Sequence, residues 1–208
     1  MPKCFVTVRS GGFLFAVVAL VGLAGCTGDN EPQPPAATPA PLATSAAPLA
    51  ADYDATGVQL CDVTDLTPLK QLGLTAAKSD AKAPPSAPGS ACLFTLKTKA
   101  GQHGSLLVDA STPESADQAK LLFQATASVT DMVDEGPIPG LGEQAEGYSG
   151  QSTASGAKTT EYLVHARTGN LVVKTFLTVG GGDYASKESV AGPSREITAG
   201  TLLLITKN

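Results

Sequence analysis

The first 28 residues limit most strongly what this chain can build. Lys3 and Arg9 are the only charged residues before Asp29, and an uncharged run from Ser10 to Gly28 follows them. That run is apolar between Phe13 and Leu23 and ends in small residues. A basic start, an apolar centre and a small-residue exit are typical of a secretory signal. We therefore expect export from the cytoplasm, with only the later residues available for a folded core.

The signal ends in Leu23-Ala24-Gly25-Cys26, which resembles a bacterial lipobox. The resemblance implies cleavage between Gly25 and Cys26 and a lipid on the Cys26 thiol, whose thiolate form is the nucleophile. Acyl chains would then hold the protein on a membrane, at about 0.8 kcal/mol for each buried methylene. We expect a lipid-anchored protein of the cell membrane that faces the extracytoplasmic side or the cell wall.

Two other interpretations of this segment stay open. The 19 uncharged residues from Ser10 to Gly28 just reach the length of a membrane-spanning helix. The glycines and the small-residue exit disfavour a retained span, because they are typical of a cleaved signal. Cleavage without lipidation is the second alternative.

Residues 27–52 predict a spacer. They are rich in proline and alanine and show neither helical nor strand periodicity. Such a segment buries too little apolar surface to offset its ordering entropy. At about 3.1 Å per residue, its reach is at most on the order of 80 Å. We therefore expect a signal over 1–25, a lipidated cysteine and linker over 26–52, and a folded domain over 53–208.

The charge balance argues against a nucleic-acid partner. The chain has 14 basic and 19 acidic residues, and loss of Lys3 and Arg9 with the signal lowers its net charge from −5 to −7. Phosphate contacts need a basic surface, which this composition does not provide. Mean hydropathy is only +0.08, which argues against a polytopic membrane protein.

Two cysteines, Cys61 and Cys92, remain in the folded part. An oxidising compartment allows them one pairing, so we expect a structural disulfide. A metal or redox pair is the alternative. The sequence has no CxxC motif, and neither histidine lies at a ligand-like spacing from a cysteine. We expect neither a metal nor a cofactor.

The folded part alternates short helices and strands. Thr67 as N-cap, Pro68 in the first turn and Gly73 as exit predict a short helix, followed by a loop over 78–90. Ser111 and Glu114 fit a capping box for a second helix. Alternating or continuous apolar patterns predict four strands and a last helix, and 129–147 read as irregular. The strands are expected over 91–99, 105–109, 158–167 and 170–179, and the last helix over 194–206.

Hairpins interspersed with helices indicate one α+β domain. We expect a mostly antiparallel sheet with helices packed on one face and one disulfide.

Several short motifs follow one another along the folded part. They are Cys61 before Thr64-Asp65-Leu66 and Leu72-Gly73-Leu74, Cys92 with Phe94, the segment 140–145, and the segment 167–173. Their order resembles a family of actinobacterial cell-wall lipoproteins that is known only as a domain of unknown function.

The resemblance covers most of residues 60–208, and the family domain is similar in layout to the disulfide-containing extracellular sensor domain of a mycobacterial receptor kinase. It implies one α+β domain, one disulfide and a surface location, and it supplies no catalytic residues. Members commonly have tryptophan near the second cysteine, whereas this chain has none.

Few residues suggest catalysis. His103 lies in a Gly-flanked turn, where a solvated side chain is expected. His165 lies on a predicted strand and is either a core histidine or a general base. Ser149 follows Gly147-Tyr148, but Gln151 stands where a nucleophile elbow has its second glycine. Gly180 to Gly182 predict a flexible turn, because no Lys-[Ser/Thr] pair follows as in a phosphate-binding loop.

An acidic group after residue 130 favours a solvated face over a Ca²⁺ site, because the EF-hand pattern is absent. Its members are Asp131, Asp134, Glu135, Glu143 and Glu146.

These observations predict a non-enzymatic module that binds an envelope protein or a small molecule, attached to a membrane through Cys26. A lipid or glycolipid carrier is the first alternative and requires an apolar cavity. A cell-wall hydrolase is the second and requires titratable residues that converge in a cleft.

Overall fold

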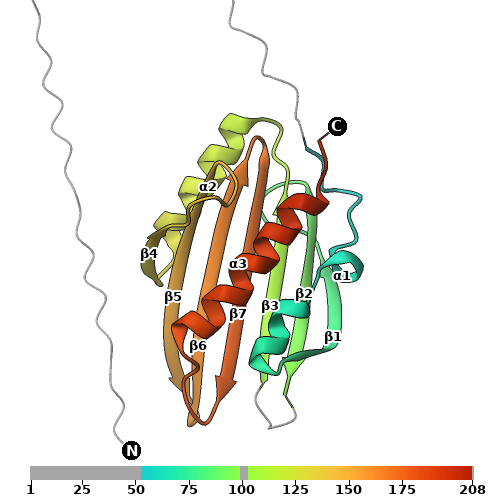
Figure 1. The fold of residues 1–208 in the computed structure, drawn as a ribbon. Helices are drawn as coiled ribbons and strands as arrows, with labels where there is room; N and C mark the ends of the chain where they lie inside the picture. Colours follow the sequence, from blue (N-terminus) through green and yellow to red (C-terminus); the bar gives the residue numbers. More distant parts are fainter. Residues whose placement is uncertain (1–52, 99–102, 208) are drawn as a thin grey trace, which may run out of the picture. The chain divides into compact units, whose positions relative to one another are not determined.

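In the computed structural model, residues 53–98 and 103–207 are described (Figure 1). The expected single α+β domain with an antiparallel sheet is confirmed, with seven strands. Its elements are α1 (Leu60–Val63), η1 (Thr67–Leu72), β1 (Thr75–Lys82), β2 (Gly89–Lys97), β3 (His103–Ser111), α2 (Ala116–Val129), β4 (Val133–Pro137), β5 (Gln144–Ala154), β6 (Ala157–Thr168), β7 (Leu171–Gly181) and α3 (Lys187–Leu204). No helix among the described residues is both long and apolar enough to cross a membrane.

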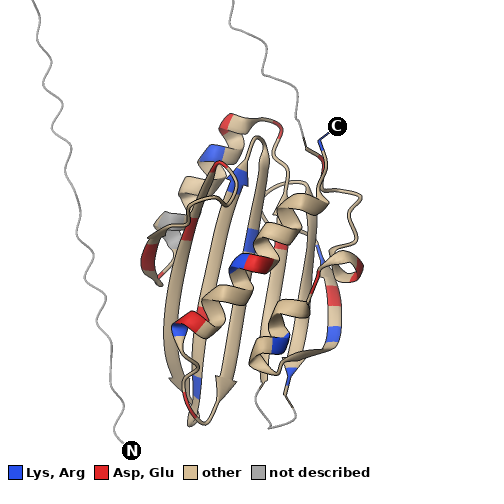
Figure 2. Cartoon of the chain, viewed as in Figure 1, with Lys and Arg blue, Asp and Glu red and all other residues tan. Residues whose placement is uncertain are grey.

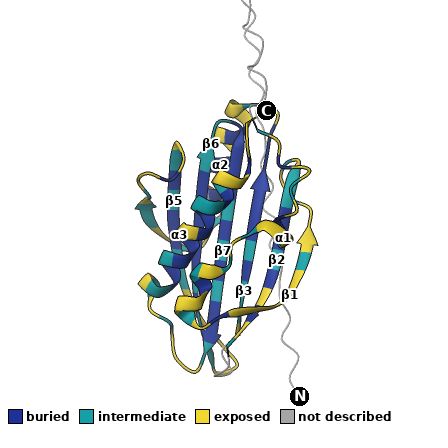
Figure 3. Ribbon diagram, turned by 45° about the vertical axis from the view of Figure 1, so that its right-hand side comes forward, coloured by how far each residue is buried: buried dark blue, intermediate teal, exposed yellow. Residues whose placement is uncertain are grey.

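The sheet consists of two antiparallel meanders that meet at its centre. Its strand order is β1-β2-β3-β7-β6-β5-β4, so the first meander is β1 to β3 and the second is β4 to β7. The last strand of each meander pairs with the other, from His103 opposite Gly180 to Ser111 opposite Val172. Burial is highest in these central strands, whereas the edge strand β1 is exposed (Figure 3).

The main core lies between the sheet and α3. Side chains that alternate along the strands, such as Leu106, Val164 and Val173, pack there with Val190 and Ile197 of α3. The short helices α1 and η1 cover the β1–β2 end of the same face. The helix α2 departs from the expected arrangement with all helices on one face, since it packs behind the sheet against β6 and β7.

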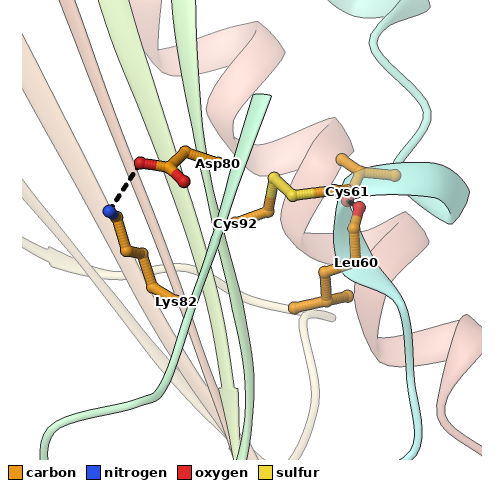
Figure 4. The surroundings of a disulfide bond; sticks show 6 residues. Leu60, Cys61, Asp80, Lys82 and Cys92 are labelled. Carbon is orange, nitrogen blue, oxygen red and sulfur yellow. Dashed lines mark hydrogen bonds and ion pairs between the residues drawn. A yellow bond between two sulfur atoms is a disulfide. The ribbon is translucent and has the colours of Figure 1, made fainter. Parts of the chain in front are cut away.

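The expected disulfide is present and joins α1 to the sheet. Cys61 of α1 bonds to Cys92 of β2, across a sequence separation of 31 residues (Figure 4). Cys92 is fully buried, and Leu60 beside Cys61 inserts into the same core. Because α1 has only four residues, intrinsic helix stability cannot hold it in place. The disulfide and this burial therefore position α1.

Two strand regions differ from the sequence-based expectations. The loop expected over 78–90 is wrong in its first part, because β1 extends to Lys82 as an exposed edge strand. Such a strand has no buried face and therefore no apolar alternation to detect. The irregular region expected over 129–147 contains β4 and the start of β5, which flank a turn at Pro139 to Glu143.

The helices also begin at other residues than the sequence predicts. The first residue of η1 is Thr67, whose N–H donates to Asp65, so Thr67 is not the N-cap, although the exit at left-handed Gly73 is confirmed. Ser111 ends β3, and Ser115 is the N-cap of α2, with its hydroxyl accepting from the N–H of Gln118. The expected C-terminal helix is confirmed, but it starts at Lys187.

Replacement of both Cys61 and Cys92 by alanine is expected to lower the free energy of unfolding by about 3–4 kcal/mol, the loop-closure figure for about 31 residues. Denaturant titration of the double variant and of the unreduced parent measures this difference. A loss well below about 1 kcal/mol would show that burial alone holds α1.

Candidate functional site

A groove lies between the N-terminal half of α3 and strands β4 to β6, on the same face as the main core. It consists of two adjoining hollows of about 320 and 340 Å³ that share Lys187. We call this feature the polar groove. The first hollow is lined by Val133, Ser149, Gly150, Gln151, Thr160 and Lys187. The second is lined by Glu135, Tyr162, Lys187, Glu188, Ala191, Gly192 and Arg195.

A bonded charge pair crosses the polar groove from β4 to α3. The Lys187 ammonium lies 2.7 Å from a carboxylate oxygen of Glu135, and the Ser149 hydroxyl donates to the other oxygen at 2.5 Å. The hydrogen bond from Lys187 is the main cause that lowers the pKa of Glu135. The same bond raises the pKa of Lys187. Both groups are therefore ionised at neutral pH.

Arg195 of α3 contacts the floor of the polar groove. Its Nη2 donates to the Tyr162 hydroxyl at 2.9 Å, and its guanidinium lies 5.7 Å from the centre of that ring. Tyr162 is 1% exposed. A Cβ atom on Gly147 would lie 2.5 Å from the Tyr162 hydroxyl, so glycine is needed there. Ser149 and Gly150 of the Gly147-Tyr148-Ser149-Gly150 motif line the groove, and the whole motif lies inside strand β5, so it is not the strand-to-helix turn of a nucleophile elbow.

Glycines on α3 open its surface at two places. A Cβ atom on Gly192 or on Gly200 would meet nothing within 4 Å, so packing does not require glycine at either position. Glycine inside a helix costs about 1 kcal/mol relative to alanine. Gly192 lines the polar groove, and Gly200 lines a smaller hollow near the other end of α3. Each hollow thus has one wall position without a side chain.

The smaller hollow is mostly apolar, as the first hollow of the polar groove is, and its lining includes Asp65 and Glu196. It holds about 140 Å³ between α3 and the segment of α1 and η1, where Val63, Pro68 and Leu204 contribute apolar surface. Leu203 beside it is 84% exposed. We call this feature the apolar hollow, and it serves below as a control site.

His165 is a buried residue of β6, outside the polar groove. It is 0% exposed and stacks on Phe123 of α2, with ring centres 4.4 Å apart. Neither ring nitrogen has a hydrogen-bond partner among the described residues. Burial is the main cause that lowers the pKa of His165 to about 3, and the positive charge of Lys174 adds to it. The imidazole is therefore neutral at physiological pH.

Charged residues flank His165 across the α2 side of the sheet. Glu146 and Lys174 are its direct cross-strand partners, and Asp109 is opposite Lys174. The Tyr148 hydroxyl donates to Glu146, and the Ser111 hydroxyl donates to Asp109. Burial raises the pKa of Asp109 and lowers that of Lys174. No serine or cysteine bonds to the ring, so the general-base interpretation gains no nucleophile in the described part of the chain.

The other residues that the sequence suggested for a site lie in different parts of the fold. Glu135 lies in the polar groove, Glu143 pairs with Arg167 at 3.0 Å, and Glu146 accepts from Tyr148. The described residues contain no group of three or more His, Cys, Asp or Glu side chains that could hold a metal ion. His103 is the exposed first residue of β3. Gly25 and Cys26 lie outside the described residues.

Three groups of the polar groove, Lys187, Arg195 and Tyr162, were not predicted from the sequence. Glu135 and Lys187 are 52 residues apart, so no local motif joins them. Glu135 and Ser149 were candidates from the sequence, but as part of an acidic face and of a nucleophile motif and not of this groove. Charged residues of both signs occur at two places along α3 (Figure 2).

Comparison with known proteins gives one similar structure. No protein-family model matches the chain, and no curated protein matches it. Among solved structures, the extracellular domain of PknH from Mycobacterium tuberculosis is similar, with 8% sequence identity and a TM-score of 0.37. The match covers 66% of this chain and 90% of that chain. A likeness of this size supports no functional conclusion.

His165 makes the stability of the domain pH-dependent. Its pKa rises from about 3 in the folded state to about 6.5 on unfolding, so its contribution is complete above about pH 6.5 and falls as the pH drops toward 3. Between about pH 7 and pH 4, the parent should lose on the order of 3 kcal/mol more unfolding free energy than a His165→Leu variant, since one pKa unit is about 1.36 kcal/mol.

Denaturant titrations of both proteins at each pH measure this difference, and the carboxyl groups common to both, including Asp109 and Glu146, largely cancel. Equal losses in the two proteins would show that the buried imidazole becomes protonated without cost.

Proposed function

We propose that this chain is a lipid-anchored cell-envelope lipoprotein whose domain binds a ligand in the polar groove and performs no catalysis. The main support is the polar groove, which holds an arginine that belongs to no ion pair among the described residues and has Gly192 at its wall. A concave site with a few convergent polar groups is the usual form of a ligand site. The lipobox at Cys26 and the linker over 27–52 support attachment to the extracytoplasmic side of the membrane.

The chemistry of the groove argues for binding over hydrolysis. Ser149 donates to Glu135, which is the arrangement that a serine nucleophile and a base would need. The bond from Lys187 lowers the pKa of Glu135, however, and a general base works best with a pKa near the operating pH. The lining residues include no histidine or cysteine. His165 lies on the opposite face of the sheet beneath Phe123.

The lipid-carrier alternative has less support. Between the sheet and α3, large side chains such as Phe94, Leu106 and Tyr162 fill the interior. The second hollow of the polar groove is lined by charged side chains, which would be costly to cover with an acyl chain. We also propose membership of the actinobacterial cell-wall lipoproteins of unknown function, on the order of motifs from Cys61 to Val173.

Lipidation at Cys26 predicts incorporation of a palmitate analogue. Full-length protein from labelled bacterial cells should carry the label, and a Cys26→Ser variant should not, because the acceptor thiol is lost. In-gel detection of the label measures this. Label that survives in Cys26→Ser, or an unlabelled parent protein, would contradict the lipid anchor.

Filling the polar groove should abolish binding. Position 192 has open space around its Cβ direction, so Gly192→Trp should fold and occupy the groove. Full-length protein is immobilised and exposed to an extract of the cell envelope, and the retained material is quantified. We expect Gly192→Trp to retain less than one tenth of what the parent retains, as for loss of a central binding contact worth about 1.4 kcal/mol or more.

The matched control is Gly200→Trp, which fills the apolar hollow on the same helix and should retain as much as the parent. Gly192→Ala should also retain binding and should stabilise the domain by up to about 1 kcal/mol. Equal retention by the two tryptophan variants, or no specific retention by the parent, would overturn the proposed function.

A further inference from the structure

Two charges of the polar groove are left without an ion-pair partner. Glu135 and Lys187 neutralise each other across the groove. Arg195 bonds to the neutral Tyr162 hydroxyl, and neither Arg195 nor Glu188 belongs to an ion pair among the described residues. A guanidinium has five N–H donors, so most of those on Arg195 stay available. The groove therefore presents one exposed cation and one exposed anion outside the bonded pair, although the charge of Arg195 helps to lower the pKa of Glu135 and that of Glu188 helps to raise the pKa of Lys187.

The positions of these charges on α3 set their separation. Glu188, Gly192 and Arg195 follow the spacing i, i+4, i+7, which places them on one helix face. Seven residues at about 1.5 Å rise put the two charged positions about 10 Å apart along the axis. Gly192 and the small Ala191 lie between them, in the hollow of about 340 Å³. Glu188 and Arg195 thus lie at the two ends of a part of α3 that has only small residues lining the hollow between them.

From this arrangement we propose that the ligand is a short peptide-like zwitterion, with its carboxylate on Arg195 and its ammonium on Glu188. This rests on the proposed function, because it uses the same groove. About three extended residues, at about 3.3 Å each, match the separation. Arginine binds carboxylates through two parallel hydrogen bonds, so Arg195 supplies the stronger contact. Gln151 and Ser149 line the adjoining hollow, on the other side of Lys187, and offer further hydrogen-bonding groups there.

The probes are trialanine, trialanine amide and N-acetyltrialanine, compared at neutral pH by saturation-transfer NMR with full-length protein in detergent. Trialanine should bind at millimolar concentration or below. The amide lacks the carboxylate and should bind about tenfold more weakly, as expected for a lost hydrogen-bonded charge. The acetylated peptide lacks the ammonium and should bind about threefold more weakly, because both charged side chains are exposed and Glu188 lacks the two parallel hydrogen bonds that Arg195 can form.

Variants assign each end of the ligand. Arg195→Gln should remove the preference for trialanine over its amide, and Glu188→Gln should remove the preference over the acetylated peptide. Lys207→Gln, which changes a charge beyond the C-terminal end of α3, is the control and should keep both preferences. Thermal denaturation of each variant checks that it folds.

The outcomes separate the ligand class from the proposed function. Equal binding of the three peptides, or no binding of trialanine, overturns the zwitterion proposal. If the envelope extract still distinguishes Gly192→Trp from Gly200→Trp in that case, the groove is a binding site for another class of ligand. If that distinction is also lost, both proposals are wrong.

Discussion

The pairing of β3 with β7 is the constraint on which the rest of the domain depends. It joins the two meanders over nine residue pairs, from His103 with Gly180 to Ser111 with Val172. Gly104 permits the close approach of these strands, because a Cβ atom there would lie 2.3 Å from the carbonyl oxygen of Thr178. Side chains alternate between the faces of a sheet, so a shift of one residue in this register would exchange both faces at once. The register of β3 with β7 therefore determines both the core beneath α3 and the side chains of the opposite face, which include His165.

That register gives the two faces different roles. On one face, Thr175 of β7 accepts a hydrogen bond from Thr198 and ties α3 to the centre of the sheet. On the other, Lys174 lies between His165 and Asp109, and α2 covers the histidine through Phe123. The helix α3 crosses the central strands and leaves part of β4 and β5 uncovered, which is where the polar groove forms. The polar groove thus forms because α3 covers only part of the width of the sheet.

The sequence predicted the central strands and the disulfide but not the polar groove, for physical reasons. Leu171, Val172 and Val173 form a continuous apolar run because their strand is covered on both faces. The edge strand β1 has no buried face, so its sequence carries no apolar period. The predicted start of α2 was wrong because Ser111 and Ser115 both precede residues that suit a helix. In the folded chain, Ser111 pairs with neighbouring strands and belongs to β3. The groove joins β4 to α3 through Glu135 and Lys187, a contact that only the folded chain creates.

The stability of α3 must come from tertiary contacts, since its own sequence weakens it. Gly192 and Gly200 each cost about 1 kcal/mol of helix propensity, and Pro193 removes a backbone donor inside the helix. Buried Val190, Ile197 and Thr198 offset this through packing on the sheet, and η1 packs against the C-terminal half. The disulfide at Cys61 holds α1, which precedes η1, on the same face. The end of α3 beside η1 is therefore supported by neighbouring elements, whereas the end beside the polar groove is supported mainly by the sheet and by the Lys187–Glu135 pair. A ligand that bridges Glu188 and Arg195 would add a constraint at the end of α3 with the fewest neighbours.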